Sequence, residues 1–300
     1  MRAFRLLVTP AMSGADNMAL DEALFTARLR AMAPPTIRFY AWAPPAISLG
    51  YGQAFQDSID LDAARRMGVA VVRRPTGGSA VLHEGPHLEL TYSVAAASGD
   101  FPDADELLAT YRWIGVAIRQ GLEQLGARVD IAAPRRARAD EMATFCFAHT
   151  GSYELTVGGR KLVGSAQRRR GGGFLQHGSV LLGTEPGRLR RVFPAELDPL
   201  EGMTTLEAAL GRRPSFDETA EALADGFRRA HRVELRSGSL SDEERSLAES
   251  LVRDKYGTEP WTRAARVLAS PVSRTAFGTL PTDRTPSRRR GEDEPAARRG

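Results

Sequence analysis

The sequence contains one cysteine, Cys146, among its 300 residues. A single thiol forms no intramolecular disulfide and builds no cysteine-rich zinc site. No apolar run approaches the roughly 18 residues that a membrane helix needs. The apolar run near the start, in "MRAFRLLVTP", is too short for a secretory signal. We therefore expect a cytoplasmic protein that has no membrane partner.

A strong charge of one sign is also missing from most of the chain, although the net charge is +4. Residues 271–300 carry seven arginines and four acidic residues, so this segment alone contributes +3 of that charge. The rest is close to neutral, and we expect no nucleic-acid partner. Local basic clusters remain, in "RRP", "RRAR" and "RRR". Such clusters are usually solvated faces, and a docking surface for an acidic partner is the alternative.

Periodicity predicts an α+β fold, with a mixed or antiparallel β-sheet and helices packed on it. Helical spacing marks residues 17–32, 104–126 and 216–231. Between residues 152 and 182, short glycine turns join three β-patterned runs, which is typical of an antiparallel meander. We expect one mixed sheet in a single catalytic-type domain over residues 1–265. A disordered tail rich in arginine, proline and acidic residues is expected over residues 271–300.

A glycine turn flanked by charge lies in "RRPTGGSAVLHEG". Gly77 and Gly78 let backbone amides approach a ligand, and Arg73 and Arg74 suit a phosphate or a carboxylate. A plain glycine hairpin with solvated arginines explains the same letters. The stretch is neither a phosphate-binding P-loop nor a dinucleotide fingerprint. His83 suits either a ligand site or an ordinary hydrogen-bonded turn.

Two further polar residues lie in β-patterned runs. Lys161 is in "GRKLVGSAQ", where it points either to solvent or into a pocket, and inside a pocket it needs an anionic partner to keep its proton. His177 is in "LQHG" and precedes a glycine. The histidines and carboxylates match no metal-ligand spacing, and no G-x-S-x-G hydrolase motif occurs. We expect no metal and no cofactor.

Cys146 lies between Phe145 and Phe147. On these neighbours alone, a small buried side chain is the more common role for a free cysteine, and a nucleophile is the rarer one.

The order of these motifs, however, resembles the lipoate-protein ligase and octanoyltransferase family, whose catalytic fold biotin-protein ligases share. The resemblance runs from about residue 4 to residue 262. It rests on "DNMALDEAL", "TIRFYAWAPPAISLGYGQ", "RRPTGGSAVLHEGPHLELTYSV", "CFAHTGSYELTVGGRKLVGSAQRRRGGGFLQHGSVLL" and "KYGTEPW". Within the family, the motifs are most similar to the LipM-type octanoyltransferase branch.

The resemblance implies a mechanism and a set of site residues. Cys146 aligns with the cysteine that carries the acyl group, and Lys161 with the lysine that lowers the pKa of that thiol. The donor is then octanoyl-acyl carrier protein, and the acceptor is a lysine of a lipoyl domain such as the glycine-cleavage H protein. Substrate-binding roles fall on Arg73, Arg74, Gly77, Gly78, Ser79, His83, Gly164, Ala166, Gln167, His177 and Gly178.

Three other functions fit the same motifs. An ATP-dependent lipoate-protein ligase uses an acyl-adenylate and needs no nucleophile, so that Arg73 and Arg74 would serve its phosphate. An amidotransferase that moves octanoyl between lipoyl domains uses the same cysteine and lysine. A non-enzymatic module that binds lipoyl domains needs no thiol at all.

Overall fold

The computed structural model describes residues 1–55, 59–133, 154–193, 200 and 202–263. Residues 1–266 form one compact unit. The expected nucleophile Cys146 and the expected disordered tail lie outside the described residues. No helix in the described part of the chain is long and apolar enough to cross a membrane.

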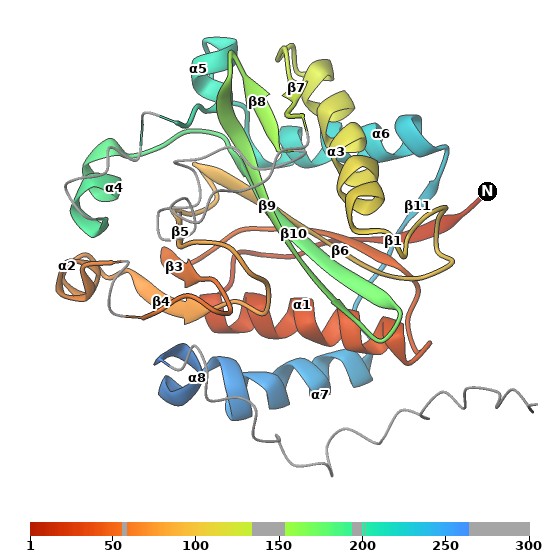
Figure 1. Ribbon diagram of the computed structural model, residues 1–300, viewed down its shortest axis with the longest axis horizontal. Coiled ribbons are helices and arrows are strands. Elements are labelled where there is room, and N and C mark those ends of the chain that lie inside the picture. Colours follow the sequence, from red (N-terminus) through yellow and green to blue (C-terminus); the bar gives the residue numbers. More distant parts are fainter. Residues whose placement is uncertain (56–58, 134–153, 194–199, 201, 264–300) are drawn as a thin grey trace, which may run out of the picture. The chain divides into compact units, whose positions relative to one another are not determined.

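An eight-stranded mixed sheet forms the centre of the unit (Figure 1). Its first three strands in spatial order are parallel to one another, and from β2 onward neighbouring strands are antiparallel. In spatial order the strands are β11 (Glu234–Ser237), β1 (Ala3–Val8), β2 (Thr36–Tyr40), β6 (Glu89–Ala97), β10 (Gly173–Leu181), β9 (Arg160–Arg170), β8 (Leu155–Val157) and β7 (Asp130–Ile131).

A second sheet of three short strands contradicts the expectation of a single sheet. Its strands in spatial order are β4 (Ala70–Arg73), β3 (Ala46–Leu49) and β5 (Val81–His83). These strands are only three or four residues long, so their periodicity is too brief to separate them from the main sheet in the sequence.

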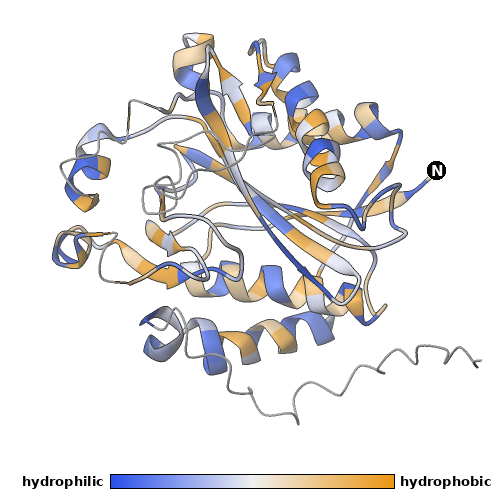
Figure 2. Cartoon of the chain, viewed as in Figure 1, coloured by the Kyte–Doolittle hydropathy of each residue, from blue (hydrophilic) through white to orange (hydrophobic). Residues whose placement is uncertain are grey.

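Two layers of helices cover the main sheet (Figure 1). One face packs on α1 (Gly14–Leu29), which α7 (Asp242–Leu251) covers in turn. The opposite face packs on α3 (Leu107–Gln124) and α6 (Phe216–His231). Figure 2 shows hydrophobic and hydrophilic residues mixed along each of these helices, as expected for helices with one buried face.

The helices α3 and α6 touch backbone to backbone because both carry glycine at the crossing. A Cβ on Gly226 would lie 2.1 Å from the carbonyl oxygen of Ala117, and a Cβ on Gly121 would lie 2.5 Å from that of Ala222. This close contact sets the distance between α3 and α6. It also explains why two glycines lie inside helices, where glycine is otherwise unfavourable.

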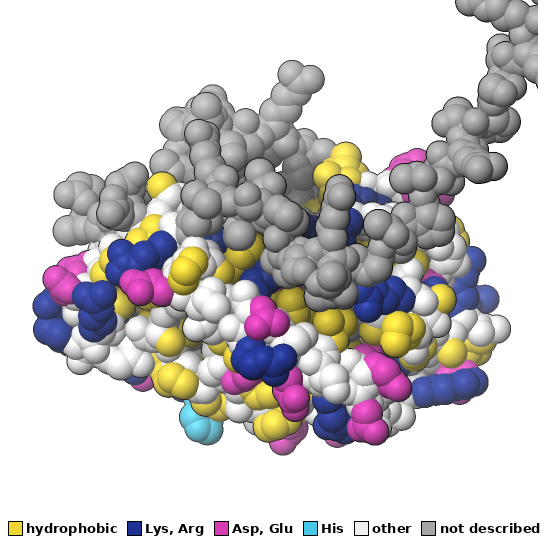
Figure 3. All heavy atoms as spheres, turned by 90° about the horizontal axis from the view of Figure 1, so that it is seen from below, with side chains coloured by type: hydrophobic (Ala, Val, Ile, Leu, Met, Phe, Trp, Pro, Cys, Tyr) yellow, Lys and Arg dark blue, Asp and Glu magenta, His cyan; other side chains and the backbone are white. Residues whose placement is uncertain are grey.

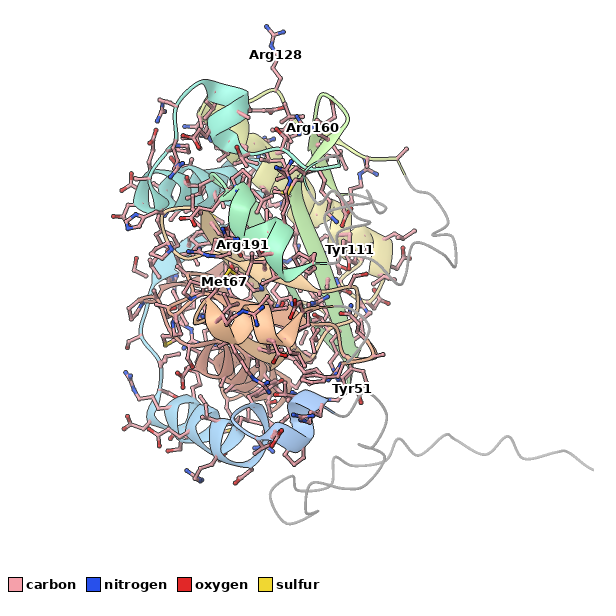
Figure 4. The ribbon with its side chains drawn as sticks, turned by 90° about the vertical axis from the view of Figure 1, so that its left-hand side faces the viewer. Tyr51, Met67, Tyr111, Arg128, Arg160 and Arg191 are labelled. Atoms are coloured by element: carbon pink, nitrogen blue, oxygen red, sulfur yellow. The ribbon has the colours of Figure 1, made fainter. Side chains whose placement is uncertain are left out.

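The remaining helices are short, and the last of them lie at the C-terminal end of the described residues. Asp60, which caps α2 (Leu61–Arg66), donates its backbone N–H to the carbonyl of Val192, the last residue of α4 (Pro186–Val192), at 3.0 Å. Figure 4 shows this pair of helices, with Met67 labelled at the end of α2 and Arg191 labelled on α4. The short elements are α2 (Leu61–Arg66), α4 (Pro186–Val192), α5 (Leu206–Leu210), η2 (Val252–Tyr256) and α8 (Glu259–Arg263).

The charge pattern of the surface agrees with a nearly neutral body. On the face shown in Figure 3, acidic and basic side chains are interspersed, and α7 and α8 contribute pairs such as Arg263–Glu259 at 2.5 Å. The "RRP" cluster is not a solvated face, because Arg73 and Arg74 are buried. The "RRR" cluster is divided between the two faces of β9: Arg169 bonds to Ala104 on the α3 side, and Arg168 lies over the ring of Tyr51.

Candidate active site

A narrow cavity lies on the α1 side of the main sheet, where the three-stranded sheet meets β6, β9 and β10. Its walls combine apolar side chains with buried polar ones, which suits an apolar ligand held in one orientation. The lining residues are Met18, Tyr40, Trp42, Ser48, Arg74, Val81, His83, Thr91, Gly164, Ser165, Ala166, His177, Gly178 and Ser179.

His83 is held on both ring nitrogens and on one ring face. Its Nδ1 donates to Glu89 Oε1 at 2.7 Å, and its Nε2 lies 2.8 Å from Ser48 Oγ. The indole of Trp42 stacks on the imidazole with centroids 3.7 Å apart. Burial alone would raise the pKa of the Glu89 carboxyl, but the charge and hydrogen bond of His83, with hydroxyl donors, hold that pKa below its usual value. His83 is therefore a fixed part of the wall.

His177 is held in the same manner by a second carboxylate. Its Nδ1 donates to Asp21 Oδ2 at 3.2 Å, and its Nε2 lies 2.6 Å from Thr76 Oγ1. Burial lowers the pKa of His177 despite the carboxylate, so the ring is neutral at pH 7 and Nε2 accepts from the Thr76 hydroxyl. Thr76 belongs to the glycine turn, so this bond ties the turn to β10.

Asp21 is a fully buried carboxylate with several partners. Burial would raise its pKa, but the hydrogen bond from His177 and the charge of Arg38 keep that pKa below the usual value. Arg38 Nη1 lies 2.8 Å from Asp21 Oδ1, and the hydroxyls of Tyr40 and Ser93 also donate to the carboxylate at 2.8 Å. A buried charge with this many partners is stabilised in its ionised form.

Arg73 and Arg74 hold the chain around the glycine turn. Arg73 donates to the carbonyls of Gly50, Tyr51 and Gln53 and twice to that of Thr262. The indole N–H of Trp261 donates back to the carbonyl of Arg73 at 2.8 Å, and Figure 4 labels Tyr51 beside α8.

Arg74 reaches carbonyls on both sides of the turn. It donates to those of Ser48, Gly77 and Ser79 at 2.6 to 3.1 Å. Both guanidinium groups therefore bind backbone oxygens, where the sequence suggested an anion.

Glycine is required at Gly78 in the turn and at Gly50, which follows β3 and lies against the turn. Gly78 has φ +89, a conformation that other residues rarely adopt. Its carbonyl oxygen lies so close to β3 that a Cβ on Gly50 would be 1.7 Å away. Gly77 and Gly78 are exposed, whereas Ser79 is buried. The expected site residues of the turn therefore adjoin the cavity, but only Arg74 lines it.

The expected residues on β9 and β10 are divided between the two faces of the sheet. Gly164, Ala166, His177 and Gly178 line the cavity. Gln167 faces away from it, because its Nε2 donates at 2.9 Å to Gln176 and to Thr110 on α3. A Cβ on Gly178 would meet the ring of Tyr92 at 2.7 Å and the hydroxyl of Ser165 at 2.8 Å. Gly178 thus makes room for Tyr92 as well as exposing backbone to the cavity.

Lys161 is buried, with 1% of its side chain exposed, and its Nζ lies 2.6 Å from Glu154 Oε1. The sequence required an anionic partner for an inward lysine, and Glu154 is that partner. In the described part of the chain, no cluster of three or more histidine and acidic residues is arranged to hold a metal ion. The position of Cys146 relative to Lys161 lies outside the described residues.

Several site residues were not singled out from the sequence. Asp21 and Asn17 are buried polar residues on α1, whose apolar residues have the spacing of a buried helix face. A carboxylate on that apolar face was the one feature of the sequence that could have marked Asp21 as a site residue. Glu89 starts a buried strand, and Ser48 lies inside one. Nothing local connects these residues with the histidines, because their partners are distant in sequence or on other strands.

The main sheet thus carries helices on both faces, and its narrow cavity is walled by two buried histidine–carboxylate pairs, which is the kind of place where a small ligand is held in one orientation. Residues 13–228 match the lipoyl protein ligase A/B catalytic domain family. The chain belongs to this family, and the fold expected from the motifs is confirmed.

Individual members of the family are similar to the chain over nearly their whole length. The chain is 43% identical to the octanoyltransferase LipM of Symbiobacterium thermophilum, over 86% of this chain and 97% of that protein. It is 37% identical to the octanoyltransferase LipM of Carboxydothermus hydrogenoformans, over 87% and 98%. Among solved structures, lipoate-protein ligase A bound with ATP is 26% identical with a TM-score of 0.74, over 87% of this chain and 98% of that one. Protein Ta0514 of T. acidophilum with bound lipoic acid is 26% identical with a TM-score of 0.72, over 87% and 100%.

Proposed function

We propose that this protein is an octanoyltransferase of protein lipoylation, which moves an octanoyl group from octanoyl-acyl carrier protein to a lysine of a lipoyl domain. The observation that carries the proposal is the 43% identity to an octanoyltransferase LipM across 97% of that relative. The glycine-cleavage H protein is the proposed type of acceptor. We keep the cytoplasm as the proposed compartment, because the single cysteine calls for no oxidising environment.

The proposed reaction has two steps. The thiolate of Cys146 attacks the thioester carbonyl of the donor, a new carbon–sulfur bond forms, and the carrier leaves as a thiol after taking up a proton. The acceptor's lysine amine then attacks the enzyme thioester, a carbon–nitrogen bond forms, and the thiol of Cys146 is regenerated. A thioester is already activated, so neither step consumes ATP.

Several features of the described residues support this proposal. Met18, Trp42 and Val81 give the cavity apolar walls for an acyl chain. A thiol with an ordinary pKa is mostly protonated at neutral pH, and a nearby cation favours its thiolate. Lys161 is buried and paired with Glu154, on the same strand as the cavity-lining Gly164. The glycines of the turn and of β9 are the proposed source of backbone donors for the tetrahedral oxyanion.

An ATP-dependent ligase is the second candidate, favoured by the similarity to lipoate-protein ligase A bound with ATP. It requires cationic groups that face the adenylate phosphate. The guanidinium groups of Arg73 and Arg74, the expected phosphate ligands, are buried and bonded to backbone carbonyls. This arrangement favours the transferase.

A direct assay separates the candidates. Purified protein is incubated with apo H protein and either octanoyl-acyl carrier protein alone or free octanoate with ATP, and the acceptor mass is followed. We expect the octanoyl mass only with the acyl carrier donor. Modification only with octanoate and ATP would establish the ligase, and transfer only from an octanoylated lipoyl domain would establish the amidotransferase. Binding of H protein without any modification would leave the non-enzymatic module.

A further inference from the structure

An irregularity in β9 determines which way Lys161 faces. Leu155 of β8 pairs with Val163, and the next residue, Thr156, pairs with Lys161, so Leu162 is skipped in the pairing. Leu162 and Val163 both belong to the core on the α3 side. A β-bulge of this kind offsets the alternation of side chains by one position. Lys161 therefore lies on the opposite face, the face of the cavity.

The backbone of Lys161 is fixed from the other side by a neighbouring segment. Its N–H donates to the carbonyl of Gly202 at 2.8 Å, and its carbonyl accepts from the N–H of Thr204 at 2.9 Å. With β8 on one edge and residues 202–204 on the other, the lysine has little freedom to turn away. Its ammonium must be satisfied inside the protein.

Glu154 satisfies that ammonium. The two side chains are 1% and 8% exposed, and their charged atoms lie 2.6 Å apart. An ammonium removed from water gives up its proton unless an anion offsets the loss of hydration. Glu154 immediately precedes β8, so the hairpin that contains the bulge also brings the carboxylate to the lysine.

We infer that Glu154 is a positioning residue for acyl transfer, which holds the Lys161 ammonium in place on the cavity face of the sheet. This inference rests on the proposed function, because it acts through the effect of Lys161 on the Cys146 thiol. Glu154 itself need not touch either substrate. Without it, Lys161 loses the carboxylate that holds its ammonium 2.6 Å away, and the cation is no longer fixed where it favours the thiolate.

The test measures the reactivity of Cys146 against pH. Because the chain has one cysteine, iodoacetamide alkylation reports on that thiol alone. We expect Glu154→Gln to slow alkylation at pH 7 by about tenfold, which corresponds to a rise of about one unit in the thiol pKa. Glu154→Asp retains the charge and should keep most of the wild-type profile. Lys161→Gln should reproduce the loss, and the double variant should be no slower than Lys161→Gln alone.

A matched control tests whether loss of any buried ion pair has the same effect. Glu244 of α7 is 1% exposed and pairs with Arg5 of β1 at 2.5 Å. Glu244→Gln should therefore lower stability but leave the alkylation profile unchanged. The inference is wrong if Glu154→Gln keeps the wild-type profile while Lys161→Gln shifts it, and the proposed function then still stands. If Lys161→Gln leaves the profile unchanged, the proposed lysine–cysteine pair fails first. If Glu154→Gln does not fold, Glu154→Asp is the test. An alkylation profile of Glu154→Asp that is shifted as far as that of Lys161→Gln would overturn the inference.

Discussion

Replacing Arg73 with lysine tests whether this arginine clamps the backbone or binds a ligand. The guanidinium contacts the carbonyl oxygens of Gly50, Tyr51 and Gln53 at 2.6 to 3.3 Å, and that of Thr262 at 3.0 and 3.1 Å from the other side. The planar fork of arginine spans both groups of acceptors, whereas a lysine ammonium donates from a single atom.

The expected loss follows from those contacts. At least two hydrogen bonds from a charged donor should be lost, each worth about 1.5–3 kcal/mol. The free energy of unfolding should therefore fall by about 3 kcal/mol or more, which for a chain of this size lowers the Tm by about 6 °C or more. Thermal unfolding of Arg73→Lys followed by circular dichroism measures this change, and Arg212→Lys, in an exposed pair with Glu218, is the control.

The kinetic outcome distinguishes the two roles of Arg73. If it is a clamp, the variant assayed well below its Tm keeps the wild-type KM for octanoyl-acyl carrier protein. An unchanged Tm together with a much higher donor KM would refute the clamp and assign Arg73 to the ligand.

Two further predictions concern the glycine turn and His177. Gly50→Ala should lower the transfer rate and cost about 1–3 kcal/mol of stability in urea unfolding, because the new Cβ meets the Gly78 carbonyl at 1.7 Å. Gly52→Ala, where a Cβ meets nothing within 4 Å, should do neither, and equal effects would contradict the prediction. Burial lowers the pKa of His177, so the unfolded chain takes up its proton near the ordinary value of 6.5 while the folded chain does not. Stability should therefore be complete above pH 6.5 and fall as the pH is lowered below it, and His177→Asn should reduce that slope between pH 7.5 and 5.5. An identical slope in the variant would contradict the shift.

Long periodic elements were predictable from the sequence. Helix α6 (Phe216–His231) has the bounds that its apolar spacing indicated, and Ser215 caps it. The meander of β8, β9 and β10 follows from its glycine turns, with Gly158, Gly159, Gly171 and Gly172 at positive φ. These features depend on residues close together in the chain, which is the information that spacing carries.

Tertiary partners were not predictable in this way. "RRP" reads equally well as a solvated or ligand-binding pair, and only the fold brings the carbonyl of Thr262 to Arg73, 189 positions away. The pairing of His177 with Asp21 likewise joins a strand and a helix 156 positions apart. The direction of Lys161 depends on a one-residue bulge, which leaves no mark in the alternation of so short a strand as β8.

The central claim is that Cys146 carries the octanoyl group, and intact mass spectrometry tests it most directly. The protein is incubated with octanoyl-acyl carrier protein without ATP or acceptor, and its mass is compared with that of Cys146→Ser. We predict one added octanoyl group on the wild type, released by hydroxylamine as expected for a thioester, and none on the variant. An octanoyl adduct that persists in Cys146→Ser would contradict the account.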